Sequence, residues 1–207
     1  CGGPAQRETD TMDTFVDSSW YYLRYTDPAN KKKFADPKKI AAWLPVPMYV
    51  GGSEHDTMHL LYSRFFAKAL HGLGFIPFSE PFTSRVTHGV ILGPDGQKMS
   101  KSRGNVVDPD KEVVQYGADT VRMYLAFMAP YEQGGPWDSK GINGVYRFLT
   151  RVWNLYTSSK SKVESKKPDE IIERSLHLAT KKIGADLESF ALNTCVSELM
   201  KLLNAIE

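Results

Sequence analysis

The chain has 207 residues, enough for one compact hydrophobic core and part of a second. Its formal net charge is only +2, so a global basic field for nucleic acid is excluded and any RNA contact must come from local patches. No apolar stretch approaches the roughly 20 residues that a membrane-spanning helix needs, which predicts a soluble protein without a membrane partner.

The two cysteines, Cys1 and Cys195, stand at opposite ends of the chain. They give no reason to expect a disulfide framework, which favours a cytoplasmic location. The sequence starts at Cys1 with neither an initiator methionine nor a charged and apolar leader. We therefore expect the natural N-terminus to lie upstream.

The first part of the chain predicts an alternation of helices and strands. The aromatic segment at residues 17–25 predicts a short helix, and the lysine-rich run at residues 30–39 predicts a solvated surface loop. The apolar run at residues 46–50, bounded by two glycines, predicts a buried parallel strand.

Residues 56–70 then have helical spacing, with Leu61 and Phe65 on the face that we expect to be buried. A strand, a glycine turn and a helix together make half of a nucleotide-binding unit. Residues 86–92 predict another strand, and residues 93–96, Gly-Pro-Asp-Gly, predict a turn after it.

The remaining chain predicts helices. Asp108 is a favoured N-cap before Pro109, and the helix is expected to continue to about Met128. From Asn143 onward the pattern is helical, interrupted by a polar, lysine-rich linker at residues 158–168. The fold class is therefore α/β followed by an all-α tail, with domains at residues 1–136 and 137–207.

The sharpest chemical signal is the loop at residues 98–102, Lys-Met-Ser-Lys-Ser, which follows a predicted strand. Two lysines and two hydroxyls on glycine-flanked backbone suit a site that holds a triphosphate while pyrophosphate leaves. Lysines stabilise developing negative charge there, and losing one such donor typically costs about 3 kcal/mol in the transition state. This pattern favours phosphate chemistry over a merely solvated basic loop.

That pentapeptide resembles the signature loop of the class I aminoacyl-tRNA synthetases, whose ATP site lies on a Rossmann-like sheet. Residues 7–22 and the Gly-Gly-x-Glu-His pattern at residues 51–55 resemble the bacterial leucyl branch. The isoleucyl and valyl branches carry Trp-Phe-Asp-Ser in the first segment, and the isoleucyl branch carries Gly-x-Asp-Gln in the second. His88, in contrast, is closer to the isoleucyl and valyl pattern, and these branches remain the alternative.

The resemblance implies roles for individual residues. The side chains implied around the leucine substrate are Phe15, Ser18, Tyr21, His55 and His59. Those implied at ATP are Gly51, Gly52, Glu54, His88, Val90, Ile91, Lys98, Met99, Ser100, Lys101 and Ser102. Lys98 and Lys101 are the implied catalytic residues, because they would bind the departing pyrophosphate.

Two of these implied roles have a plain physical basis. The glycines let the backbone approach a ribose closely, and Glu54 can accept hydrogen bonds from its hydroxyls. For Phe15 and Tyr21, ordinary core packing is the alternative.

The implied reaction is ATP-dependent activation of leucine to leucyl-adenylate, followed by transfer to tRNA(Leu). Mg²⁺ is expected with the ATP, although no carboxylate is identifiable as its ligand. His55 and His59 alone are weak evidence for a metal, and Cys1-Gly2-Gly3 resembles only the tail of a zinc knuckle. No zinc is therefore predicted.

The resemblance also places the chain within a larger enzyme. Residues 1–136 would be the second half of the catalytic domain, and residues 137–207 the start of the anticodon-binding helical bundle. The N-terminal half of the synthetase would be a necessary partner. The alternative is a chain that alone only binds nucleotide or tRNA, because half a sheet leaves an exposed edge.

Overall fold

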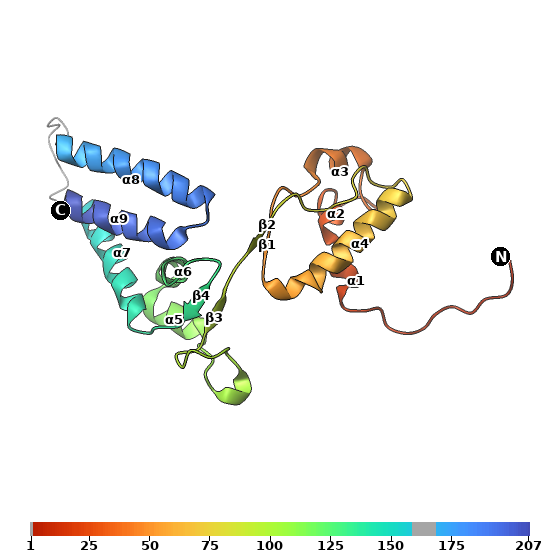
Figure 1. The fold of residues 1–207 in the computed structure, drawn as a ribbon, viewed down its shortest axis with the longest axis horizontal. Coiled ribbons are helices and arrows are strands. Elements are labelled where there is room, and N and C mark those ends of the chain that lie inside the picture. The colour runs from red at the N-terminus through yellow and green to blue at the C-terminus, as the bar shows by residue number, and fades with distance from the viewer. Residues whose placement is uncertain (1, 159–168) are drawn as a thin grey trace. The chain divides into compact units, whose positions relative to one another are not determined.

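The computed structural model describes residues 2–158 and 169–207 (Figure 1). Cys1 and nearly all of the predicted linker at 158–168 lie outside the described residues. The chain divides into two compact units, Cys1–Thr87 and His88–Glu207. No helix in the described ranges is long and apolar enough to cross a membrane.

The first unit contains short helices around one parallel strand pair. Its elements are α1 (Phe15–Ser18), α2 (Tyr21–Tyr25), α3 (Pro37–Trp43), β1 (Tyr49–Gly51), the 3-10 helix η1 (Ser53–Asp56), α4 (His59–Gly72) and β2 (Arg85–Thr87). β1 and β2 run parallel with Val50 opposite Val86, which confirms the predicted parallel strand. Leu23 and Ile40 are completely buried at the centre of this unit.

The prediction of which face of α4 is buried was wrong. Leu61 and Phe65 are 55% and 71% exposed, whereas the buried residues of the helix are His59, Ser63 and Ala67. Both rows have the same four-residue spacing, so periodicity alone cannot choose between them. The buried row is the one that the aromatic residues of α2 and β1 contact.

Three other expectations for this unit need correction. The strand begins at Tyr49 rather than residue 46, and it is not fully buried, because Val50 is 42% exposed. The predicted helix at 17–25 is two helices with a break between Ser18 and Tyr21. The predicted loop at 30–39 ends early, because Asp36 caps α3 by accepting a hydrogen bond from the Lys38 backbone N–H.

The second unit is mostly helical. It contains β3 (Val90–Leu92), the 3-10 helix η2 (Lys101–Arg103), α5 (Pro109–Tyr116), α6 (Ala118–Phe127), β4 (Gly134–Pro136), α7 (Gly141–Thr157), α8 (Glu170–Glu188) and α9 (Leu192–Ile206). Asp108 caps α5 as predicted. The core joins α6 to α7 through Tyr124, Trp137 and Val145, and β3 pairs in parallel with β4.

Here too the boundaries differ from expectation. The predicted strand at 86–92 is two strands in separate sheets, and β4 was not foreseen because Gly134, Gly135 and Pro136 carry no strand signal. Gly117, with φ +85°, divides the predicted helix into α5 and α6. Along the chain, the boundary between the two compact units falls between Thr87 and His88, so residue 136 lies inside the second unit. The domain boundary at residue 136 stays a prediction.

Candidate functional site

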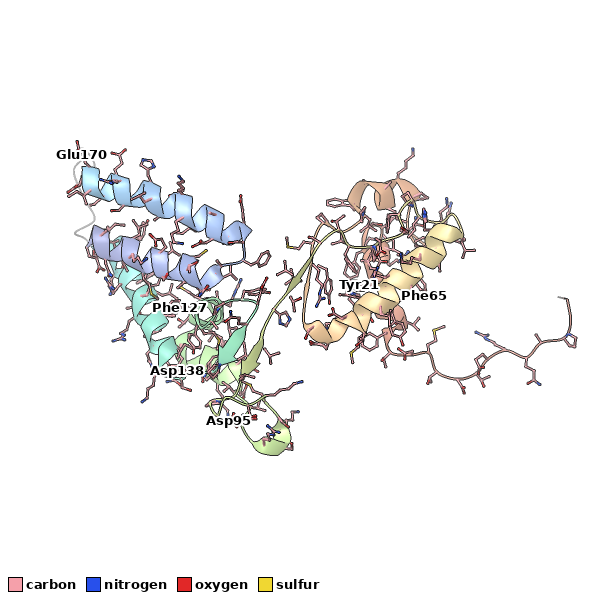
Figure 2. The ribbon with its side chains drawn as sticks, in the orientation of Figure 1. Tyr21, Phe65, Asp95, Phe127, Asp138 and Glu170 are labelled. Atoms are coloured by element: carbon pink, nitrogen blue, oxygen red, sulfur yellow. The ribbon has the colours of Figure 1, made fainter. Side chains whose placement is uncertain are left out.

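The first candidate site is a cluster of rings around the buried side chain of His59, which is the first residue of α4. Tyr21 of α2 lies against this helix (Figure 2), with its ring centroid 5.8 Å from that of His59. Tyr49 of β1 and Phe82 lie at 5.4 and 5.9 Å, and His55 of η1 lies edge-on at 6.1 Å. We call Tyr21, Tyr49, His55, His59 and Phe82 the aromatic–histidine cluster.

The environment of His59 favours a neutral ring. Burial lowers the pKa of His59 below its usual range, and the electrostatic influence of the neighbouring His55 lowers it further, while a hydrogen bond with the Ser18 backbone raises it. The Ser63 hydroxyl lies 3.2 Å from the Nδ1 atom of the ring. The ring is therefore held as a neutral polar group inside an aromatic shell.

Three polar atoms in this region are buried without a hydrogen-bond partner among the described residues. They are His59 Nε2, His55 Nδ1 and the Tyr22 hydroxyl. Buried polar groups are nearly always hydrogen-bonded, so unpaired ones call for an explanation. A ligand with polar groups, surrounded by aromatic walls, is the kind of occupant that would satisfy them.

The structure brings the predicted leucine-binding residues together in this unit. Tyr21 and His55 contact His59 directly, and the Ser18 backbone influences its pKa. Phe15 stacks on Tyr62 of α4 with centroids 5.7 Å apart. Sequence reasoning missed Ser63, Tyr62 and Phe82; Ser63 was detectable from its position one helical turn after His59.

At Gly51 and Gly52, neighbouring side chains approach the backbone closely. A side chain at Gly52 would meet the Glu54 carboxylate, and one at Gly51 would meet the Tyr49 ring. Both glycines are buried, whereas Glu54 is exposed. The backbone at this bend is thus compact, and the Glu54 carboxylate is available to a ligand.

The second candidate site is the signature loop, residues 98–102, in the other unit. Asn105, which follows the loop, connects it to the preceding turn by two hydrogen bonds. Its Oδ1 accepts from the Ser100 backbone N–H at 2.8 Å, and its Nδ2 donates to Asp95 at 3.0 Å. The Asn105 hydrogen bond lowers the pKa of the Asp95 carboxyl. Gly104 ends η2 with a left-handed φ of +68°, a conformation that glycine adopts readily.

The lysines of the signature loop are exposed, and neither has an ion-pair partner in the described ranges. Met99 lies between them and packs against the core of the second unit. The hydroxyls of Ser100 and Ser102 lie 2.8 Å apart. The loop is therefore anchored at its centre, with Lys98 and Lys101 available to a multiply charged anion.

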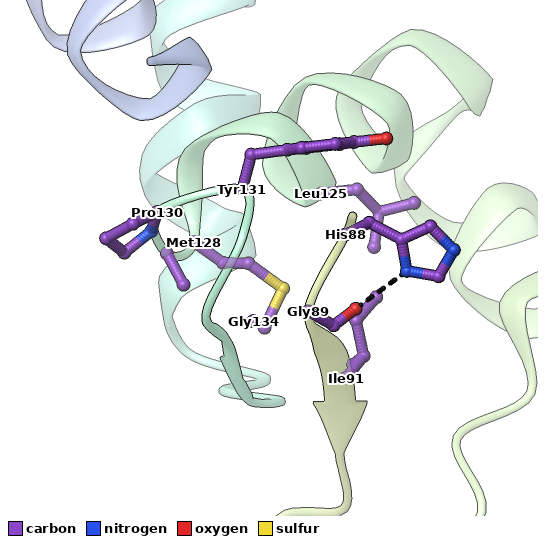
Figure 3. A pocket seen from close by; sticks show the side chains of 9 residues that line it. His88, Gly89, Ile91, Leu125, Met128, Pro130, Tyr131 and Gly134 are labelled. Atoms are coloured by element: carbon purple, nitrogen blue, oxygen red, sulfur yellow. Dashed lines mark hydrogen bonds between the residues drawn. The ribbon is translucent and has the colours of Figure 1, made fainter. Parts of the chain in front are cut away.

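A pocket of about 170 Å³ lies beside β3 (Figure 3). Its lining includes His88, Gly89, Ile91, Leu125, Met128 and Tyr131. His88 Nδ1 lies 3.0 Å from the Gly89 carbonyl oxygen, so it must donate to it. Of the residues predicted for ATP, this pocket includes His88 and Ile91, but neither Val90 nor the signature loop.

Among the residues that the structure describes, no three His, Cys, Asp or Glu side chains are placed to hold a metal ion. The residues predicted for ATP are divided between the two units: Gly51, Gly52 and Glu54 in the first, and the others in the second. Their shared role stays a prediction.

The model of the family "tRNA synthetases class I (I, L, M and V)" matches residues 2–138, which include both candidate sites. The chain belongs to this family. Its fold is therefore the catalytic-domain fold of class I synthetases, which confirms the α/β expectation at that level.

Curated class I synthetases match the whole chain closely. The leucine–tRNA ligase of Deinococcus radiodurans is 54% identical over 207 residues, and that of Herpetosiphon aurantiacus is 51% identical over the same length. Each match covers 100% of this chain and 25% of the relative. The chain thus spans about a quarter of the length of these relatives.

A solved class I synthetase structure agrees. The ternary complex of Agrobacterium radiobacter K84 agnB2 LeuRS with tRNA and LeuAMS is 40% identical, with a TM-score of 0.86. It matches 100% of this chain and 28% of that chain. These comparisons confirm the resemblance to the leucyl branch.

Proposed function

We propose that this chain is part of a leucine–tRNA ligase, which activates leucine with ATP and transfers it to tRNA(Leu). The observation that carries the proposal is the identity of 51–54% with curated leucine–tRNA ligases across all 207 residues. Both candidate sites lie within the region matched by the family model. The remainder of the synthetase is the partner that would complete them.

In this proposal, the aromatic–histidine cluster is the leucine site, with Phe15 and Ser18 beside it. Aromatic walls suit a branched apolar side chain, while the unpaired buried atoms of His55 and His59 suit a ligand that also has polar groups. Such a pocket discriminates one methylene by only about 1 to 3 kcal/mol. Isoleucine and valine are therefore the competitors to test.

The proposed activation step joins leucine to AMP. A leucine carboxylate oxygen attacks the α-phosphorus of ATP, a new P–O bond forms, and the bond to the β-phosphate bridging oxygen breaks to release pyrophosphate. Lys98 and Lys101 stabilise the charge that accumulates on this leaving group. Their exposure and lack of ion pairs in the described ranges support that role.

The remaining ATP contacts are assigned by the same proposal. Gly51, Gly52 and Glu54 hold the ribose, and the backbone of Val90 and Ile91 holds adenine, with His88, Met99, Ser100 and Ser102 completing the site. Mg²⁺ is expected to accompany ATP when bound and to neutralise phosphate charge. The described residues offer no cluster of metal ligands, so no ligand is assigned to it.

The helical tail belongs to the proposal as well. Residues 137–207 are the start of the anticodon-binding bundle, and residues 1–136 the second half of the catalytic domain. Helices α7, α8 and α9 support this, since all of the described tail after Gly141 is helical apart from its connections. A cytoplasmic location is part of the same proposal.

One alternative is specifically supported: the chain alone binds nucleotide or tRNA without catalysing a reaction. Each of its described sheets has only two strands, and Val50 on β1 is 42% exposed. A complete catalytic core would need further strands to cover that edge.

The test is a chimera in which this chain replaces the matching quarter of the Deinococcus radiodurans relative. Amino-acid-dependent pyrophosphate exchange is measured with leucine, isoleucine and valine in parallel. The proposal predicts exchange with leucine and at least tenfold less with the other two. Exchange that prefers isoleucine or valine would overturn the leucine assignment, and a folded chimera without exchange would leave only the binding function.

A further inference from the structure

Ser63 is a completely buried hydroxyl one helical turn after His59. Its Oγ lies 2.7 Å from the His59 carbonyl oxygen and 3.2 Å from the His59 Nδ1 atom. The hydroxyl thus contacts both the backbone and the ring of the same residue. No role for Ser63 follows from the motifs that identify the family.

The hydrogen-bond inventory decides which partner donates. A hydroxyl has one proton, and the His59 carbonyl oxygen can only accept. The Ser63 hydroxyl therefore donates its proton to this carbonyl oxygen at 2.7 Å. Towards Nδ1, the Ser63 oxygen then has only lone pairs to offer. The 3.2 Å contact is a hydrogen bond only if Nδ1 carries the ring proton.

A neutral histidine with its proton on Nδ1 has a bare lone pair on Nε2. His59 Nε2 is buried and has no hydrogen-bond partner among the described residues. Burial and the neighbouring His55 lower the pKa of His59 and outweigh a hydrogen bond with the Ser18 backbone, which raises it, so a second proton on the ring is disfavoured. The expected state of His59 is therefore a neutral ring with a hydrogen-bond acceptor at Nε2.

We infer that Ser63 is a positioning residue that fixes His59 as the Nδ1–H tautomer, so that Nε2 is an acceptor for a hydrogen-bond donor of the bound substrate. The choice of tautomer rests on the two contacts of the Ser63 hydroxyl. The link to substrate rests on the proposed function, because it places His59 in the leucine site. The two parts are tested by different measurements.

The tautomer is tested by NMR on the 207-residue chain labelled with ¹⁵N-histidine. The two nitrogens of a neutral ring have widely separated shifts, so the protonated one is identified directly. His71 is an internal reference, because its Nδ1 must donate to the Ile76 carbonyl oxygen at 3.1 Å. We expect His59 to show the same pattern as His71; an Nε2–H pattern would overturn the inference.

Variants then connect the tautomer to the hydroxyl. Ser63→Ala is expected to shift His59 towards the Nε2–H form and leave His71 unchanged. Ser63→Thr retains a hydroxyl that can bond the same carbonyl and is expected to restore the original pattern. The matched control is Ser175→Ala, which removes an equivalent hydroxyl bond to Ile171 in α8 and is expected to leave His59 unaffected.

The substrate link is tested in the chimera that shows leucine-dependent exchange. Loss of one neutral hydrogen bond predicts that Ser63→Ala raises the KM for leucine about fivefold, with the KM for ATP unchanged and with rescue by Ser63→Thr. An equal effect on both substrates would overturn the substrate link while leaving the tautomer result intact. A chimera inactive without any Ser63 change would instead count against the proposed function.

Discussion

The aromatic–histidine cluster and the signature loop are positioned by different forces. The cluster is assembled by burial: His59 is 6% exposed, and its neighbours come from α2, β1, η1 and the segment before β2. The signature loop is assembled by hydrogen bonds within a short stretch of chain, from Asp95 to Asn105, and its lysines remain exposed. In the proposed function this difference has a reason: a pocket for the leucine side chain needs a fixed shape, whereas lysines that bind a departing pyrophosphate need to stay free to move with it.

The largest expected effect comes from the packing of the first unit. Leu23 is completely buried beside Tyr22 and Ile40, so Leu23→Ala should lower the free energy of unfolding by about 2 to 5 kcal/mol. Urea unfolding of the 207-residue chain measures this change. Leu73→Ala, at a side chain 70% exposed, is the control and should stay within about 0.5 kcal/mol of the parent. Equal effects of the two substitutions would contradict the description of this core.

The signature loop should respond in the opposite way, with loss of activity and little loss of stability. Lys101→Ala in the chimera should reduce leucine-dependent exchange by about 100- to 1000-fold, because one donor to the leaving group is removed. Its melting temperature should hardly change, since Lys101 is exposed. Lys111→Ala on α5, another exposed lysine, is the matched control. Exchange retained within threefold in Lys101→Ala would remove this lysine from the mechanism.

A smaller effect on exchange is expected from Asn105, which anchors the signature loop, than from Lys101, which is proposed to bind the leaving group. Asn105→Ala removes the bonds to the Ser100 N–H and to Asp95, so exchange should fall about tenfold through kcat. Asn143→Ala, at an exposed amide on α7, is the control. In a double-mutant cycle, Asp95→Ala and Asn105→Ala should couple by about 1 kcal/mol. Additive effects would mean that the Asp95–Asn105 contact does not support the loop.

The smallest expected effect is a pH dependence of the first unit. The pKa of His59 is lower in the folded state than in the unfolded chain, so the unfolded state binds more protons as pH falls through 6.5. Stability should therefore decrease between pH 7.5 and 5.5. Glu80, whose pKa Arg64 and Lys68 lower to about 2, stays ionised throughout that range.

Urea midpoints at the two pH values measure this decrease. His59→Gln should reduce it, whereas His177→Gln, at an exposed ring, should leave it unchanged. A pH dependence that persists fully in His59→Gln would assign it to another group.

The sequence predicted the local features of both sites because their causes are local. The turn at residues 93–96, the Asp108 cap and the helical tail depend on neighbouring residues, and all three are confirmed. The division of one predicted helix at Gly117 also has a local cause, the positive φ of this glycine. The sequence did not predict it, because a single glycine does not show which φ it adopts. The sequence did not predict β4 either, because this strand is defined by its pairing with β3, which exists only in the folded chain.

By itself, the sequence determined the family and the position of the signature loop, since that loop is contiguous and its hydrogen bonds span at most ten residues. It also named His55 and His59, which share one motif. Only the tertiary structure decided that α4 buries the row of His59 and Ser63 instead of Leu61 and Phe65. Burial depends on which distant segments pack against a helix, and four-residue spacing is the same for both rows.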